Sequence, residues 1–168
     1  MFYALSALLF LYPALVILGG VYDLATMKIP NWISIALVGI FIPIALIVGL
    51  SWQDGAISLA MGFVALVIGI VLFALRILGG GDAKLLAASI VWVGMSGLVP
   101  FLAITALAGG ALSVALLVAR KWVPMMPVSL PSWLQRLMQP KGDIPYGVAI
   151  AAGAVLAFPY SQLLLKLS

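Results

Sequence analysis

Long uncharged apolar segments, separated by short polar ones, make up almost the whole chain. They cover about 2–22, 31–50, 56–75, 85–119 and 144–165. A helix needs about 20 apolar residues to cross the hydrocarbon core of a bilayer. The segment 85–119 is too long for one crossing, and SGLVP at 96–100 breaks it into two short ones. The pattern predicts an all-α membrane protein with six transmembrane helices, forming a single domain over residues 1–168.

The polar stretch between the last two predicted spans, 120–143, contains one amphipathic segment, SLPSWLQRLMQP. Its apolar side chains share one helical face opposite the polar ones, with Trp133, Leu134, Leu137 and Met138 against Gln135, Arg136 and Gln139. This pattern is typical of a short helix lying in the membrane interface. The sequence leaves two interpretations open, a connector that rests on the membrane and a movable flap over a site.

Composition narrows the chemistry that this chain can perform. It is 66% hydrophobic and 7% charged, whereas soluble domains carry about a quarter charged residues. It has no cysteine and no histidine, so it lacks thiolates, the commonest metal ligand and the commonest general base. We therefore expect no metal site and no cofactor. The acidic residues are four aspartates, which become the leading candidates for acid–base chemistry: Asp23, Asp54, Asp82 and Asp143.

The basic residues predict how the chain is oriented. Seven of the eight fall in alternate loops on one side of the predicted bundle: Lys28, Arg76, Lys84, Arg120, Lys121, Arg136 and Lys141. Only Lys166 falls on the other side. Because cytoplasmic loops are enriched in Lys and Arg, we expect these loops in the cytoplasm and both termini outside it. Basic residues this few and scattered do not indicate a nucleic-acid partner.

Asp23 and Asp82 stand at the ends of different spans on the predicted cytoplasmic side. Asp82 follows the glycine run in LRILGGGDAKLLAA, where a helix N-cap is an alternative role. Asp23, in GGVYDLATMKIPNW, falls at the C-terminal end of a helix, where the dipole disfavours a carboxylate. Lys28 could pair with it. An ionisable residue near membrane depth is nevertheless a functional candidate.

The two aspartates can converge if their helices pack together. Nearby carboxylates share a proton, so one could activate water while the other hydrogen-bonds a substrate carbonyl. Gly79, Gly80 and Gly81 would let an extended peptide approach the backbone closely. We expect Asp143 to cap the last span and Asp54 to be solvated in a turn.

These motifs together resemble the prepilin peptidases, polytopic aspartic proteases with a G-x-G-D motif, and most closely the short forms that serve tight-adherence (Flp-type) pili. The resemblance covers essentially the whole chain. It rests on Asp23 with Ile29-Pro30-Asn31, on the run GGGD at 79–82 with Lys84, and on Ile144-Pro145-Tyr146-Gly147.

The resemblance implies cleavage of the short leader of Flp-type prepilins at the cytoplasmic face of the bacterial inner membrane. It implies that Asp23 and Asp82 are catalytic. Supporting roles are implied for Lys84, Pro145, Tyr146 and Gly147, beside Lys28 and the three glycines. Longer family members carry a further domain with paired cysteines and also N-methylate the pilin; this chain has no cysteine, so methyl transfer is not expected.

Two functions from other classes stay open. The first is a small proton-coupled transporter subunit with Asp23 and Asp82 as relay groups, although transport sites typically lie near the bilayer midplane. The second is a non-catalytic assembly factor of a pilus machine, against which the matched aspartates are the main argument.

Overall fold

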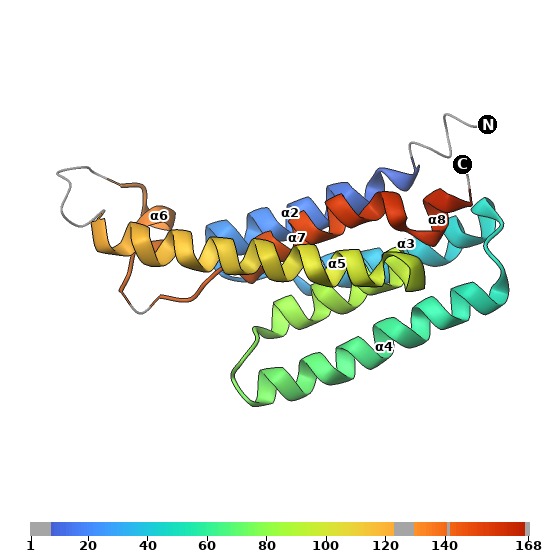
Figure 1. Cartoon of the computed structure of the whole chain (residues 1–168), viewed down its shortest axis with the longest axis horizontal. Helices are drawn as coiled ribbons and strands as arrows, with labels where there is room; N and C mark the ends of the chain where they lie inside the picture. The colour runs from blue at the N-terminus through green and yellow to red at the C-terminus, as the bar shows by residue number, and fades with distance from the viewer. Residues whose placement is uncertain (1–7, 123–129, 141, 167–168) are drawn as a thin grey trace.

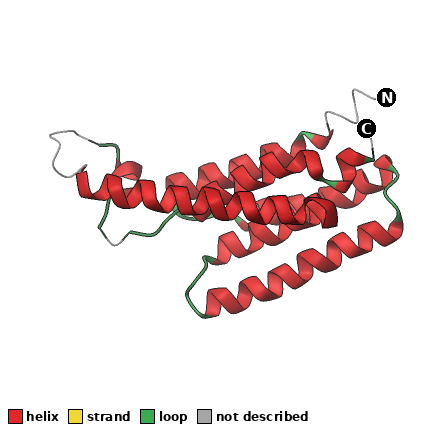
Figure 2. Ribbon diagram, viewed as in Figure 1, coloured by secondary structure: helices red, strands yellow, loops and turns green. Residues whose placement is uncertain are grey.

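A computed structural model describes residues 8–122, 130–140 and 142–166 of the chain. All regular structure in these ranges is helical (Figure 2). The helices are α2 (Leu11–Thr26), α3 (Asn31–Val48), α4 (Trp52–Ala74), α5 (Gly80–Trp122), α6 (Ser132–Leu137), α7 (Tyr146–Ala157), the 3₁₀ turn η2 (Phe158–Tyr160) and α8 (Gln162–Leu165). The all-α expectation is confirmed.

Four of the described helical segments are long and apolar enough to cross a bilayer: Asn31–Val48, Trp52–Ala74, Gly80–Trp122 and Tyr146–Leu165. The apolar helix α2 is shorter as described, and the start of the first predicted span lies outside the described residues. These helices indicate a multi-pass membrane protein. The count of six crossings goes beyond them and stays a prediction.

Helix α5 is two arms joined at Gly94, where the backbone leaves helical geometry (φ 63°, ψ −166°). Figure 1 shows the arms running in opposite directions, so the chain turns back on itself. Only glycine adopts such angles readily. The expected break within 96–100 is therefore misplaced, since Pro100 sits inside the second arm.

The reversal at Gly94 is held by the C-terminal end of the chain. Ser96 Oγ donates to the carbonyl oxygen of Tyr160 at 2.7 Å. A Cβ on Gly94 would lie 2.8 Å from Oε1 of Gln162 in α8, so the turn also needs glycine for space. These contacts place the turn of α5 against the segment that follows α7.

Small residues let α4 approach the first arm of α5. A Cβ on Gly62 would meet the side chain of Val91, and one on Gly69 would lie 2.8 Å from the Cβ of Ala83. Helix pairs in membranes associate through such close backbone approach, because burial of apolar surface gives little driving force in lipid. Most of the other residues of α4 are exposed, and Figure 1 shows this helix at the edge of the bundle.

The core is centred on Trp92 in the first arm of α5. Its ring stacks on Tyr12 of α2 at a centroid distance of 4.9 Å and meets Phe41 of α3 edge-on at 5.8 Å. Its Nε1–H donates to the carbonyl oxygen of Leu37, also in α3, at 2.8 Å. Buried Trp side chains keep a hydrogen-bond partner in this way. The cluster fixes α2, α3 and α5 relative to one another, which positions the residues at their ends.

Candidate active site

Asp23 lies in the last turn of α2 and is only 6% exposed. Helix α2 ends just beyond it, at Met27, which has a left-handed backbone (φ 56°) and whose N–H donates to the carbonyl oxygen of Asp23 at 2.7 Å. This turn leads the chain directly into α3. Because the dipole at a helix C-terminus disfavours a carboxylate, stabilisation of Asp23 has to come from neighbouring elements.

Asp82 lies in the first turn of α5 and is 8% exposed. Helix α5 begins at Gly80, so Asp82 is its third residue rather than its N-cap. The carboxylate hydrogen-bonds back to the N–H of Gly79, as the third residue of a capping box does. Its Oδ1 is buried and finds no hydrogen-bond partner among the described residues.

The two carboxylates line one pocket of about 290 Å³ where α2 ends and α5 begins. The α2–α3 loop and the glycine run form its walls: Asp23, Met27, Lys28, Ile29, Asn31, Gly79, Gly80, Gly81 and Asp82. Asp82 is close enough to Asp23 for a direct charge–charge interaction. The structure thus brings together two side chains that the sequence separates widely.

The start of α7 closes the site from a third direction. The backbone N–H of Gly147 donates to Oδ2 of Asp23 at 2.7 Å and also hydrogen-bonds Asp82. A Cβ on Gly147 would lie 2.8 Å from that Oδ2 and 2.9 Å from Cδ1 of Ile29. Pro145 precedes the helix as its N-cap residue, and Tyr146 opens it. The third predicted motif therefore lies beside the first two.

The glycine run is needed for space around the pocket. A Cβ on Gly79 would lie 2.6 Å from Oδ2 of Asp82, and one on Gly81 would lie 3.0 Å from Cβ of Ile29. At Gly80 the nearest atom is a ring carbon of Phe73 at 3.4 Å, an ordinary contact. None of the three has a positive φ, so crowding by the chain's own residues, rather than a special turn, favours glycine at positions 79 and 81, whereas Gly80 has room for a methyl group.

Lys84 joins two helices that border the pocket. Its Nζ donates to Oδ1 of Asn31 at 2.8 Å, which links the second turn of α5 to the first residue of α3. Because Asn31 lines the pocket, this contact holds one wall in place. Lys28 also lines the pocket, and within the described ranges no ion pair connects it to Asp23.

The remaining aspartates do not join the pocket. Asp54 lies in the first turn of α4, where its N–H donates to Oγ of Ser51 at 3.1 Å and its carboxylate accepts from that hydroxyl at 2.6 Å. Ser51 is therefore the N-cap of α4, and Asp54 is the third residue of that helix, partly exposed and hydrogen-bonded to the cap rather than part of a turn. The expectation that Asp143 caps the last span is wrong, because no side chain caps α7.

Arg120, near the end of α5, has a role that the sequence analysis missed. Its Nε donates to the carbonyl oxygen of Leu137 at 2.7 Å, and its Nη2 donates to that of Asp143 at 2.8 Å. The side chain thereby holds both α6 and the segment that leads to Gly147. An arginine after a long apolar segment predicts which side of the membrane that end faces. It does not indicate that the side chain will bind carbonyl groups many residues later in the chain.

The chemistry available in the pocket is proton transfer. Two adjacent buried carboxylates, with backbone N–H donors at Gly79 and Gly147, can exchange protons with a bound water and a carbonyl group. Among the described residues, no group of three or more His, Cys, Asp or Glu side chains gathers as a candidate metal site.

Comparison with known protein families relates the chain to a family of proteases. The model of the type IV leader peptidase family matches residues 10–114, a range that includes Asp23 and Asp82 and ends before Gly147. Comparison with curated proteins and with solved structures found no significant match. Because the family match spans well over half of the chain, the chain belongs to the type IV leader peptidase family, membrane proteases that act on prepilin-type substrates.

Proposed function

We propose that this protein is an aspartic endopeptidase that removes the N-terminal leader of Flp-type prepilins at the cytoplasmic face of the inner membrane. The observation that carries the proposal is the pairing of Asp23 with Asp82 in one pocket. Family membership supports a leader-peptidase activity. The aspartic mechanism and the Flp-type substrate are our inference from the pocket and the motifs.

The proposed reaction is hydrolysis of the peptide bond that precedes the hydrophobic helix of the prepilin. One carboxylate takes a proton from a water molecule, whose oxygen bonds to the scissile carbonyl carbon. The other aspartate, protonated, hydrogen-bonds the carbonyl oxygen as negative charge develops there. The C–N bond then breaks, and a proton passes to the leaving amine. The backbone N–H of Gly147, bonded to Oδ2 of Asp23, orients one member of the pair.

The proposed topology has six crossings with the pocket at the cytoplasmic interface. It takes the two arms of α5 as separate spans, in keeping with the reversal at Gly94. Basic residues at the pocket end of the bundle support this orientation, among them Lys28 after α2, Arg76 after α4 and Arg120 near the end of α5. Both termini are then extracytoplasmic.

The position of the aspartates favours a peptidase over a transporter. Both lie in terminal turns, Asp23 at the end of α2 and Asp82 at the start of α5, whereas transporter sites typically lie at mid-membrane. A non-catalytic assembly factor would have no need for two buried carboxylates held together, because burying like charges is costly.

The proposal is tested with the purified full chain in proteoliposomes and a synthetic Flp-type prepilin that contains the leader and the hydrophobic segment. We expect a shortened product whose N-terminal sequence begins directly before the hydrophobic helix. An intact substrate after prolonged incubation, with a chain shown to be folded by its circular dichroism spectrum, would exclude the peptidase and favour the other two functions.

Alanine substitutions within the glycine run should affect cleavage unequally. Gly79→Ala would push the carboxylate of Asp82 aside, and displacement of a catalytic group by about 1 Å can cost about 100-fold in rate. Gly80→Ala adds a methyl group at ordinary contact distance, so we expect a clearly smaller loss. Cleavage rates in membranes at matched expression test this order, and equal rates for the two variants would contradict it.

A substitution in the helix α6 can distinguish the two interpretations of the last loop, a connector that rests on the membrane and a movable flap over the site. Helix α6 packs against α2, with Leu137 buried and Trp133 40% exposed. If α6 gates the pocket, Trp133→Ala should slow prepilin cleavage several-fold without lowering the melting temperature, because its ring contributes little to the buried core. Gln135→Ala, on the opposite face, is the matched control. An unchanged rate for Trp133→Ala would favour the connector.

A further inference from the structure

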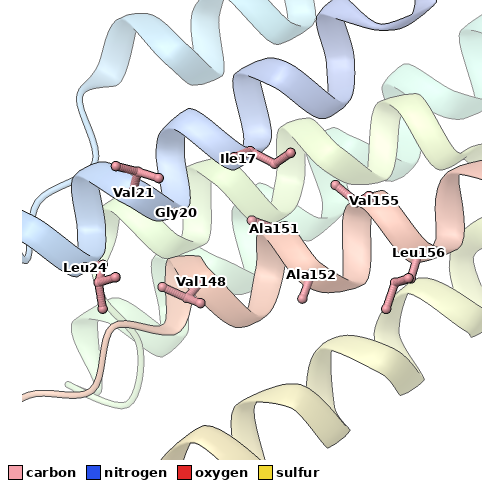
Figure 3. Close-up of a pocket in the computed structure, with 9 residues that line it drawn as sticks. All are labelled: Ile17, Gly20, Val21, Leu24, Val148, Ala151, Ala152, Val155 and Leu156. Atoms are coloured by element: carbon pink, nitrogen blue, oxygen red, sulfur yellow. The ribbon is translucent and has the colours of Figure 1, made fainter.

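An apolar groove runs along the surface between α2 and α7, beside the aspartate pocket. It has a volume of about 360 Å³, and no polar side chain lines it. Figure 3 shows its walls, formed from α2 by Ile17, Gly20, Val21 and Leu24, and from α7 by Val148, Ala151, Ala152, Val155 and Leu156. We call it the α2–α7 groove.

The groove forms where small residues bring the two helices together. A Cβ on Gly20 would lie 3.1 Å from the Cβ of Ala151 and 3.2 Å from the carbonyl oxygen of Gly147. Larger side chains stand on either side and are about half exposed, 49% for Ile17 and 59% for Leu156. The result is a shallow apolar groove with small residues along its floor.

One end of the groove adjoins the candidate catalytic residues. Leu24 directly follows Asp23 in α2, and Val148 directly follows Gly147, whose N–H hydrogen-bonds Asp23. The other end, at Leu156, lies eight residues further along α7, which corresponds to about 12 Å at 1.5 Å per helical residue. The groove therefore leads from the carboxylates along the apolar faces of the two helices.

We infer that the α2–α7 groove binds the first turns of the substrate's hydrophobic helix, the part that follows the scissile bond. This inference rests on the proposed function. With the scissile bond at the aspartates, the residues after it have to enter the bilayer along the enzyme surface, and the groove starts at that point. Its small floor residues allow a helix to approach closely, as membrane helices require. Continuity with the pocket distinguishes this surface from the other lipid-facing apolar surfaces of the bundle.

The test compares two substrates: a synthetic prepilin with its hydrophobic helix, and a short peptide that spans the cleavage site without the helix. In Ala152→Phe the new ring fills the groove, so the ratio of kcat/KM for the long substrate to that for the short one should fall about tenfold, the range typical of a changed hydrophobic pocket. Ala60→Phe is the matched control, because Ala60 is an exposed residue of α4, and it should leave the ratio unchanged.

A crosslinking measurement identifies the occupant directly. With p-benzoylphenylalanine in place of Val155, in the full chain carrying Asp82→Asn, irradiation should join the enzyme to the hydrophobic segment of the prepilin. Crosslinks to a second copy of the chain only, or to lipid only, would overturn the inference, as would an unchanged kcat/KM ratio in Ala152→Phe. If the native chain cleaves neither substrate, the proposed function itself fails and the inference fails with it.

Discussion

Asp82→Asn and Asp23→Asn are each expected to abolish prepilin cleavage while the protein stays folded in the membrane. Asn keeps the size of Asp but cannot take up or release a proton, and a general acid or base contributes about 10² to 10⁴-fold to a rate. Because the two carboxylates act as a unit, the double variant should be no worse than either single variant. The measurement is conversion of co-expressed prepilin to its mature form, followed by electrophoretic mobility.

Asp54→Asn is the matched control for this experiment. Asp54 lies in the first turn of α4 and accepts a hydrogen bond from Ser51, which an asparagine oxygen can also accept. We expect normal cleavage by this variant. Normal cleavage by Asp23→Asn or Asp82→Asn would show that the dyad assignment is wrong. Monodisperse elution in detergent separates loss of chemistry from loss of the fold.

The sequence predicts those parts of the fold that follow from apolar length and from local turn chemistry. The uncharged run 31–50 predicts α3 (Asn31–Val48) almost to the residue, and SLPSWLQRLMQP predicts the short helix α6. The break in α5 is predicted to exist but is placed within 96–100, which ends at Pro100, rather than at Gly94. Proline is tolerated inside membrane helices, because neighbouring groups can satisfy the carbonyl that it leaves free. The turn falls instead at Gly94, whose backbone has a positive φ and whose surroundings place Gln162 where a Cβ would lie, an arrangement of distant residues that only the folded chain reveals.

For the candidate site too, the sequence predicts the local features but not the contacts between distant residues. Asp23, Asp82 and the glycine run stand out in the sequence because polar and flexible residues are conspicuous in an apolar chain. Their convergence depends on how α2 and α5 pack around Trp92, which involves partners far apart in the sequence. The parts that the sequence could not predict are backbone and long-range contacts: the N–H of Gly147 on Asp23, and Arg120 on two distant carbonyl groups. A backbone N–H donor cannot be recognised from the sequence, because nearly every residue type has one.

Gly147→Ala should reduce prepilin cleavage nearly as strongly as loss of a catalytic carboxylate. The added methyl would lie 2.8 Å from Oδ2 and 2.9 Å from Cβ of Asp23, so either α7 or the carboxylate has to move. Displacement of a catalytic group by about 1 Å can cost about 100-fold in rate, and overpacking costs about 1–3 kcal/mol of stability. We therefore expect a large fall in kcat and only a modest fall in the melting temperature. Gly110→Ala, on an open face of α5 with no atom within 4 Å of the new Cβ, should keep full activity.

A double variant separates the two contacts that the new methyl would make. The Cβ would also lie 2.9 Å from Cδ1 of Ile29, and Ile29→Val removes that atom. If crowding against Ile29 causes the defect, the double variant Gly147→Ala, Ile29→Val should recover cleavage. We expect no recovery, because the contact with Asp23 persists. Recovery would show that Gly147 serves the packing of the α2–α3 loop, and the orienting role assigned to its N–H would then have to be abandoned.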